Sequence, residues 1–306
     1  MRPLRNALVR YRTVRQLVET QRTYGEGGPS RARAWAHVLR LLAAPRRTVL
    51  CYPSRPGSWT VLYKLCAVSG YWITTDPAAR YDAAVVWDDE TWSAVGPFRG
   101  EAGALNRACT DISKRHVARV FRDTFGYDLE VDPTAYQGAI VKKSDENWTH
   151  DGIVVEGPVA ASDVEPGFVY QKAVDNRRDD GPGFYEYRVP VFGRTVPVVY
   201  VKYRPPDAPF KEFSGADIVD PADVLSADER ARLLAFAAAL GLDYGELDVL
   251  RDRGDGRVYV VDANKTPSGP RRGFGPEQKV EALRALRPAF EALLAESGRR
   301  LAERRA

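Results

Sequence analysis

GELDVLRDRGDGRVYVVDANKTPSG, residues 245–269, is the stretch around which the rest of the chain is organised. LDVLR predicts a short strand, RGDG a turn, and RVYVVDANK a second strand that ends in a Pro/Gly loop, so together they predict a β-hairpin. Side chains alternate across a strand, so Asp262 and Asn264 point to the same face. Asp248 lies on the partner strand, in a position to face them.

Two carboxylates and an amide oxygen that converge on one point would form a site for a hard cation. Mg²⁺ accepts such oxygen ligands and often completes its shell with substrate phosphates. A hairpin with a polar, solvated outer face would show the same three residues, so the hairpin alone leaves both interpretations open. The remaining parts of the chain decide between them.

Length and composition are those of a globular protein with ample core. The 306 residues, 44% hydrophobic and 28% charged, suit one large domain or two smaller ones. No apolar run reaches the roughly 18–20 residues that span a bilayer, and MRPLRNALVRYR lacks the apolar segment of a secretory signal. The three cysteines show no CxxC spacing and the three histidines no metal-ligand spacing. Reduced thiols in a cytoplasmic protein, without zinc, are therefore expected.

Residues 1–44 predict a basic helical extension, because apolar residues recur at helical spacing between arginines. Residues 1–47 hold eleven arginines and two glutamates, so the rest of the chain, whose total formal charge is +4, sums to about −5. Such an arm suits an acidic membrane surface, a nucleic acid or an acidic partner protein, and binding to a membrane surface would make the protein membrane-peripheral. A solvated Arg-rich helical face is the alternative. No RNA-binding or helix-turn-helix pattern indicates a specific nucleic acid.

Residues 45–110 predict a small parallel α/β domain. RTVLCY (47–52) is a strand, 58–69 a helix, and YWITTD (71–76) and YDAAVVWDD (81–89) two further strands. A β-α-β unit implies parallel pairing, and ligands bind at loops beyond the carboxyl ends of such strands. The first of these loops, PSRPGS, contains Arg55 but is not a phosphate-binding P-loop, since it lacks GxxxxGK[ST].

The middle of the chain predicts an amphipathic helix beginning with DISK (111–114), followed by strand, polar loop and strand over 136–159. The first strand carries Lys142 and Lys143 to the mouth of the loop SDENWTHDG (144–152). A loop of this length over a lysine is typical of a phosphate-covering flap. An exposed hairpin with two lysines is the alternative.

The last third predicts strand 167–176, hairpin 185–205, helix 220–242 capped near Ser226, and a final helix over 276–297. On the hairpin, Glu186 and Arg188 alternate with apolar residues, as do Lys202 and Arg204. One face is therefore apolar and the other largely cationic. Cations aligned along a strand face suit a triphosphate, although a solvated sheet face would also show them.

In this order, the parts resemble the ATP-grasp superfamily, and most of all D-alanine–D-alanine ligase and related carboxylate–amine ligases. The resemblance covers roughly residues 47–275, and ELDVLRDRGDGRVYVVDANKTPSGP is its most specific piece. It implies an α/β and α+β chain in which two α+β subdomains clamp ATP behind a parallel α/β domain. The implied domains are the extension 1–44, the substrate-side domain 45–110, and ATP-grasp subdomains 111–170 and 171–306, the second with the metal-binding hairpin.

The resemblance also implies roles for individual residues. Asp248, Asp262 and Asn264 would hold Mg²⁺, or Mn²⁺ in its place, on the β- and γ-phosphates of ATP. The remaining nucleotide contacts would come from Lys142 at the α- and β-phosphates, or Lys143 if Gly152 shifts the register by one; Lys114 or Arg119; Gln171 and Lys172 at the adenine, with Val174 beside it; Asp179 or Asp180 at the ribose; and Lys202 at the γ-phosphate. Lys202 and Arg188 are the residues implied to serve the chemistry.

Three departures from the family pattern leave these residues chemically competent. Asp262 replaces a usual Glu, Gln171 replaces a hinge Glu, and the flap SDENWTHDG has few glycines. The implied activity is ADP-forming activation of a small-molecule or peptide carboxylate as an acyl phosphate, which then joins an amine. We expect Arg55, Arg271 and Arg272 to bind the acid. A phosphotransferase on the same fold, or a nucleotide-binding module that acts through protein contacts, are the alternatives.

Overall fold

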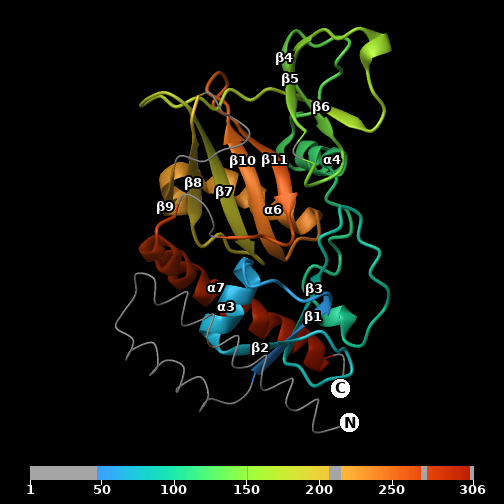
Figure 1. The fold of residues 1–306 in the computed structure, drawn as a ribbon, viewed down its shortest axis with the longest axis vertical. Helices are drawn as coiled ribbons and strands as arrows, with labels where there is room; N and C mark the ends of the chain where they lie inside the picture. Colours follow the sequence, from blue (N-terminus) through green and yellow to red (C-terminus); the bar gives the residue numbers. More distant parts are fainter. Residues whose placement is uncertain (1–46, 150, 207–214, 270–273, 304–306) are drawn as a thin grey trace. The chain divides into compact units, whose positions relative to one another are not determined.

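The computed structural model describes residues 47–149, 151–206, 215–269 and 274–303 (Figure 1). The expected basic extension 1–44 lies outside these residues. The chain forms two compact units, the second made of 89–94 and 108–265 and the first of the remaining described segments. Within the described chain, no helix is both long and apolar enough to cross a membrane.

The first unit contains the predicted parallel sheet. Strands β1 (Arg47–Pro53), β2 (Tyr71–Thr74) and β3 (Ala83–Trp87) pair in the order β2-β1-β3, with both pairings parallel. The crossover helix α3 (Val61–Ser69) begins at Thr60, whose side chain accepts from a backbone N–H, and ends at Gly70 in the left-handed conformation. The expected β-α-β unit is confirmed.

The C-terminal helix α7 (Pro276–Glu303) also belongs to the first unit, together with a single turn η1 (Glu101–Gly103). It packs on α3 and β3 through buried residues that include Leu283, Leu286 and Phe290. The sequence expectation grouped 276–306 with the second ATP-grasp subdomain. Helical spacing identifies which face of α7 is apolar, but it does not identify the sheet that this face covers.

The second unit is built on an antiparallel sheet in the order β11-β10-β7-β8-β9. Its strands are β7 (Phe184–Phe192), β8 (Val199–Arg204), β9 (Gly215–Val219), β10 (Tyr244–Arg251) and β11 (Val258–Asn264). The hairpins β7–β8 and β10–β11 were predicted, whereas β9 was not.

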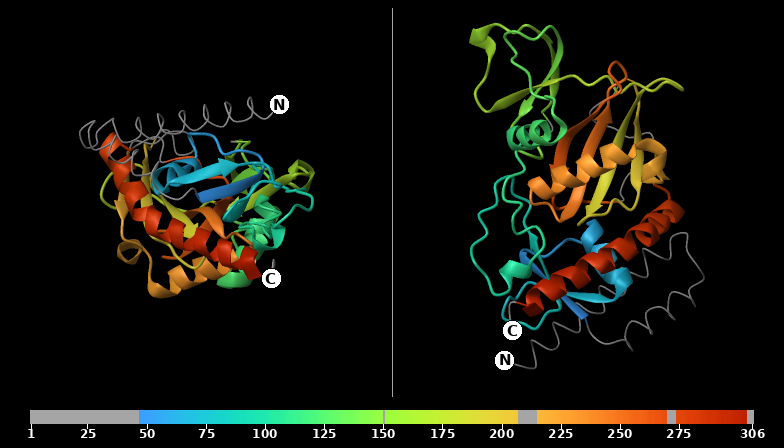
Figure 2. Two further views of the ribbon diagram at one scale, coloured as in Figure 1. Left: turned by 90° about the horizontal axis from the view of Figure 1, so that it is seen from below. Right: turned by 180° about the vertical axis from the view of Figure 1, so that it is seen from behind.

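One face of this sheet is the hydrophobic core of the unit. Helices α4 (Lys114–Phe125) and α6 (Ala227–Ala239) supply apolar side chains to a buried cluster that includes Phe121, Phe236, Leu247 and Val249. Figure 2, seen from behind, shows α6 lying across the sheet. A short helix α5 (Pro221–Val224) precedes α6, which begins with a capping box between Ser226 and Glu229. Since this face carries the core, the polar residues of the same strands collect on the other face.

A smaller antiparallel sheet has the order β5-β4-β6. It consists of β4 (Gly138–Ser144), β5 (Ile153–Gly157) and β6 (Phe168–Lys172), with a turn η2 (Ala161–Asp163) before β6. The register pairs Val141 with Gln171 and Lys143 with Val169, so these four side chains share one face. Lys142 belongs to the opposite face. The loop between β4 and β5 is the predicted flap.

Candidate nucleotide and metal site

The hairpin β10–β11 brings four polar side chains together on the polar face of the large sheet. Asp248 pairs with Asp262 and Glu246 with Asn264 across the two strands. Side chains directly opposite one another in an antiparallel pair lie about 5 Å apart at Cβ. The predicted meeting of Asp248 with Asp262 and Asn264 on one face agrees with this register, and Glu246 adds a third carboxylate.

A β-bulge puts Asp262 on this face. The register shifts between Asp248 and Val249, so that Val249 pairs with Val260 and Val261 is the extra residue. Val260 and Ala263 are fully buried in the core. Without the bulge, strict alternation would place Asp262 on the same face as Val260. Because of the extra residue Val261, Val260 faces the core while Asp262, two positions later, faces the polar side of the sheet.

Arg188 on β7 is shared between two of these carboxylates. Its guanidinium donates to both oxygens of Asp248, Nε at 2.7 Å and Nη2 at 2.8 Å, and to Glu246 through Nη1 at 3.2 Å. Burial opposes ionisation of Asp248, but Arg188 and Lys202 outweigh it and lower the pKa of this carboxyl. Burial raises the pKa of Glu246, which Arg188 counters. The strand face thus holds an ionised Asp248 against a fixed cation.

Strands β7 and β8 show the reverse arrangement, in which one carboxylate lies between two cations. Glu186 on β7 accepts from Lys202 and from Arg204 on β8, at 2.7 Å each. Glu186 and Lys202 are cross-strand partners, so the pair follows directly from the register. The polar face is therefore a lattice of alternating charges in which the cations predicted for phosphate contact are held in place by carboxylates.

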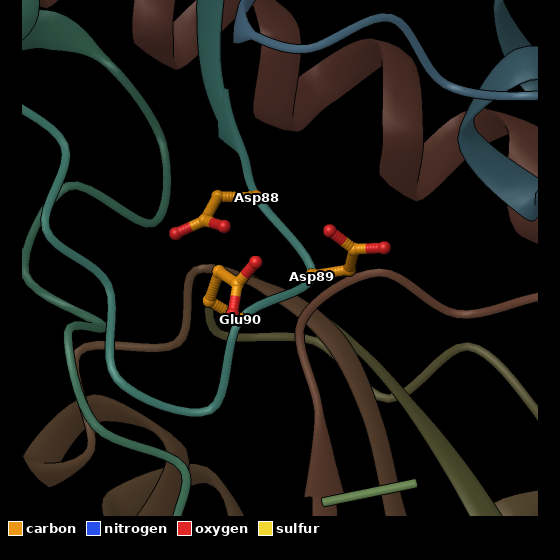
Figure 3. Close-up of side chains that lie close together, drawn as sticks. All are labelled: Asp88, Asp89 and Glu90. Atoms are coloured by element: carbon orange, nitrogen blue, oxygen red, sulfur yellow. The ribbon is translucent and has the colours of Figure 1, made fainter.

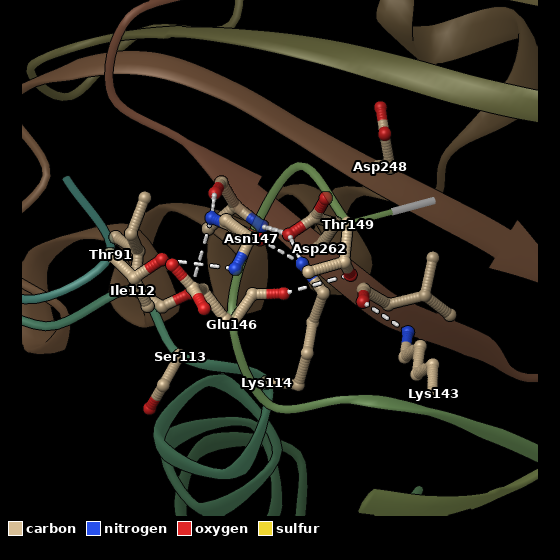
Figure 4. A network of polar contacts seen from close by, with 12 residues as sticks. Thr91, Ile112, Ser113, Lys114, Lys143, Glu146, Asn147, Thr149, Asp248 and Asp262 are labelled. Atoms are coloured by element: carbon tan, nitrogen blue, oxygen red, sulfur yellow. Dashed lines mark hydrogen bonds and ion pairs between the residues drawn. The ribbon is translucent and has the colours of Figure 1, made fainter. Parts of the chain in front are cut away.

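Asp262 is paired with Lys114 at the start of α4. Lys114 Nζ lies 2.8 Å from Asp262 Oδ1, and the lysine is 7% exposed (Figure 4). Ser113 caps the helix by accepting from the backbone of His116. Of the two cations proposed for this helix, only Lys114 reaches the carboxylates. Arg119 is exposed, and its guanidinium lies 2.7 Å from His116 Nδ1.

The two lysines of β4 point in opposite directions. Lys143 donates to the carbonyl oxygen of Val261 at 3.1 Å, next to Asp262. Burial, and then the positive charge of Lys114, lower the pKa of Lys143 to about 8. Lys142 is hydrogen-bonded to Glu165 and its ammonium lies 4.7 Å from the centre of the Phe168 ring. Lys143 is therefore the lysine that meets the polar face, and Lys142 lies away from it.

Gln171 and Lys172, predicted to meet the adenine, also separate by strand alternation. Gln171 is 2% exposed, and its Nε2 is buried without a hydrogen-bond partner. A buried amide donor without a partner is costly. Gln171 lies on the same face of the small sheet as Lys143, so an acceptor atom of a bound ligand would satisfy its Nε2. Lys172 instead binds the turn between β10 and β11, through Asp252 and Asp255 at 2.9 Å each. Val174 packs against the large core.

Asp179, Asp180 and Arg55, also predicted to contact the ligands, make no hydrogen bond or ion pair with the polar face in the described part of the chain. Asp179 pairs with Arg253 and Asp180 with Arg178, and both aspartates are exposed. Arg55 belongs to the first unit and donates to the carbonyl of Ile73 at 2.8 Å. Residues 271 and 272 lie outside the described residues.

Three consecutive carboxylates follow β3. Ligand oxygens of Asp88, Asp89 and Glu90 lie within 4.8 Å of one another (Figure 3). Neighbours in sequence lie close for that reason alone, and two of the three are exposed. Asp88, Asp89 and Glu90 are therefore not assigned a metal.

Two residues of the polar network were not predicted from the sequence. Glu246 lies two positions before Asp248 on the same strand, so alternation alone could have identified it. Asn147 lies in the loop between β4 and β5, and nothing in its sequence context distinguishes it from the other polar residues there. Only the contacts that it makes in the folded chain reveal it.

The donors and acceptors of this face fit a metal–nucleotide complex. Asp248 and Asp262 are paired with Arg188 and Lys114, so the face holds its carboxylates against positive charge, and a divalent cation could take the place of these partners. Oxygen ligands from Asp248, Asp262 and Asn264 suit Mg²⁺ or Mn²⁺. Lys143, Lys202 and Arg204 add positive charge, which phosphates require.

Comparison with known proteins gives matches at the level of structure. No protein-family model matches the sequence, and neither does any curated protein. A D-alanine–D-alanine ligase from Bacillus anthracis, solved with ATP, is 16% identical, with a TM-score of 0.51, over 86% of this chain and 100% of that chain. ATP-grasp ligase PsnB, solved with a minimal precursor, Mg and ADP, is 17% identical, with a TM-score of 0.51, over 82% and 97%.

Other solved structures of PsnB differ in the share of their own chain that aligns with this protein. The complex with precursor peptide PsnA2 and AMPPNP gives a TM-score of 0.50 over 82% of this chain and 97% of that chain. In two further PsnB complexes the match spans only 64% and 61% of the neighbour. At such low identity these comparisons concern the backbone arrangement alone. The antiparallel sheets, the parallel N-terminal sheet and the matches with TM-scores of 0.50 and 0.51 show that the chain has the fold of the ATP-grasp ligases.

Proposed function

We propose that this protein is an ATP-dependent ligase. It activates a substrate carboxylate as an acyl phosphate, releases ADP, and joins the activated acid to an amine or a similar nucleophile. One observation carries the proposal: the polar face of β7, β8, β10 and β11 presents carboxylates and cations in alternation, on the fold of the ATP-grasp ligases. That the neighbours were solved with ATP, or with Mg and ADP, supports the same assignment.

Asp248, Asp262 and Asn264 are proposed to hold Mg²⁺, which would bind the phosphates and offset the charge that builds up during transfer. Lys143 and Lys114 are proposed to contact the phosphates from β4 and α4. Gln171 is proposed to meet the adenine through its buried amide. Lys142, although predicted for the phosphates, points away from this face, and Lys143 takes its place in the proposal.

Arg188 and Lys202 are proposed to serve the transfer step. Lys202 is held by Glu186, and Arg188 is held by both Asp248 and Glu246, so each presents positive charge at a defined place on the strand face. Glu246 can retain Arg188 when Asp248 binds a metal ion. The loop between β4 and β5 is proposed to exclude water from the phosphates.

The test is product formation. Purified protein would be mixed with Mg²⁺-ATP and a panel of carboxylic acids, including peptides, with and without amines, while ADP and product mass are followed. We expect ADP release that requires an acid, and a product whose mass equals acid plus amine minus water. ADP release with a phosphorylated product and no need for an amine would indicate a phosphotransferase instead. Absence of nucleotide turnover with every acid would contradict the proposal.

Recognition of the acid is proposed to involve Arg55, Arg271 and Arg272. Arg55 follows β1 in the sequence, Arg271 and Arg272 follow β11, and a carboxylate is well matched by a guanidinium. Arg→Ala variants at the three positions would be compared for the apparent affinity of the acid. Unchanged affinity in all three variants would exclude this assignment while leaving the nucleotide site untouched.

A further inference from the structure

Asn147 is a buried residue within the loop between β4 and β5. It is 8% exposed, while its neighbour Trp148 is 53% exposed and adopts a left-handed backbone conformation with φ of 69°. Non-glycine residues rarely adopt that conformation unless the surrounding structure enforces it. The chain therefore changes direction after Asn147, and the Asn147 side chain lies on the buried side.

All of the polar groups of the Asn147 side chain are used inside the site. Its Oδ1 accepts from Lys114 Nζ, and its Nδ2 donates to the carbonyl oxygens of Ile112 and Ala263, at 3.4 Å each (Figure 4). Its backbone N–H donates separately to Thr91 Oγ1 at 2.9 Å. The backbone contact anchors the loop, whereas the side-chain carbonyl is directed at the lysine.

Lys114 is thus held between the loop and the metal face. Its ammonium donates to Asn147 on one side and to Asp262 on the other. A metal ion at Asp262 would compete with Lys114 for this carboxylate. Asn147 would then be the acceptor left to Lys114, and that acceptor matters because a buried ammonium without a partner is strongly disfavoured.

We propose that Asn147 is the positioning residue that allows Lys114 to release Asp262 to the metal while staying at the phosphates. The inference rests on the proposed metal–nucleotide site. It assigns to the loop a role beyond covering the phosphates, namely to supply the oxygen that holds the displaced lysine. The Mg²⁺ dependence of nucleotide binding therefore depends on Asn147 through Lys114.

The experiment measures ADP affinity by calorimetry with and without Mg²⁺, and takes the ratio as the Mg²⁺ enhancement. For the wild-type protein we expect an enhancement. Asn147→Ala should reduce it about tenfold, which corresponds to about 1.4 kcal/mol of coupling. Thr91→Val is the matched control, because it weakens the anchor of the loop backbone but keeps the carbonyl that faces Lys114. It should reduce the enhancement less than twofold.

A double-mutant cycle separates positioning from general structure. If Asn147 acts through Lys114, Asn147→Ala should cause no further loss in a Lys114→Gln background. Asn147→Ser is the substitute should Asn147→Ala fail to fold, and circular dichroism verifies each variant. Equal losses in Asn147→Ala and Thr91→Val, or additive losses with Lys114→Gln, would overturn the inference. Wild-type protein that binds ADP without Mg²⁺ enhancement would instead overturn the proposed metal site.

Discussion

At the scale of single residues, the two adjacent lysines of β4 have the same side chain but face opposite sides of the strand. Lys142 and Lys143 are adjacent, yet one is paired with Glu165 and the other contacts the backbone beside Asp262. We expect Lys143→Met to weaken ADP binding about tenfold or more, because the proposed phosphate contact would be lost. Lys142→Met is the matched control and should change it less than twofold. Calorimetry would check both, and equal effects would show that the assignment to Lys143 is wrong.

The lowered pKa of Lys143 predicts a pH dependence of nucleotide binding. With a pKa of about 8 in the free protein, Lys143 is mostly protonated at pH 7 and mostly neutral at pH 9. Phosphate favours the protonated form and so raises this pKa in the complex. Affinity for ADP should therefore be nearly constant below pH 7 and fall as pH rises through 8, by up to tenfold per pH unit.

Lys143→Met provides the control for this pH dependence. The variant has no group to titrate at this position, so its affinity should vary little between pH 7 and 9. A wild-type affinity that stays flat over the same range would contradict the role of Lys143. Calorimetry in buffers with different ionisation enthalpies would show proton uptake on binding at pH 8–9 in the wild-type protein alone.

The sequence did not separate Lys142 from Lys143, for a physical reason. The two residues have the same chemistry, and the loop allows either register. Which one faces the site depends on how β4 pairs with β6, where Lys143 meets Val169 and Lys142 meets Tyr170. That register is set by long-range pairing rather than by local pattern.

At the scale of elements, the hairpin β10–β11 and strand β7 share a buried charge network. Arg188 joins Asp248 to Glu246, and Glu246 is 3% exposed. We expect Arg188→Leu to lower the free energy of unfolding by about 3 kcal/mol or more, because it leaves two buried carboxylates without their main partner. Urea denaturation would measure this.

Arg204→Leu is the matched control for that variant. It removes one partner of Glu186, which retains Lys202 at 2.7 Å. The expected loss is therefore about 1 kcal/mol. Losses of the same size in Arg188→Leu and Arg204→Leu would mean that Glu246 and Asp248 do not depend on Arg188.

The elements themselves were largely predictable where the pattern was local. Alternation identified the hairpins, and Ser226 marked the start of α6. The bulge that turns Asp262 to the polar face was not predicted, because it shows only in the register between the strands. The sequence likewise identified Arg188, Lys202 and Asp248 as polar residues of the strands, but not which of them pair with one another or with Glu246.

At the scale of the whole molecule, the order of elements indicated the fold although no family model matches the sequence. The parallel N-terminal sheet and the two antiparallel sheets agree with that expectation. Strand β9 and the placement of α7 in the first unit were not predicted. The placement of α7 depends on contacts between segments far apart in the chain, which a pattern along the sequence does not contain, whereas β9 pairs with the preceding strand β8.

The central claim is that Asp248, Asp262 and Asn264 bind the metal of a metal–nucleotide complex. Its most direct test is a crystal structure of the protein with Mn²⁺ and a non-hydrolysable ATP analogue, with the metal located by anomalous scattering. The account predicts an anomalous peak within coordination distance of Asp248, Asp262 and Asn264, with Arg188 and Lys114 displaced from the two carboxylates. A peak elsewhere, such as at Asp88, Asp89 and Glu90, with both ion pairs of the hairpin intact, would contradict it.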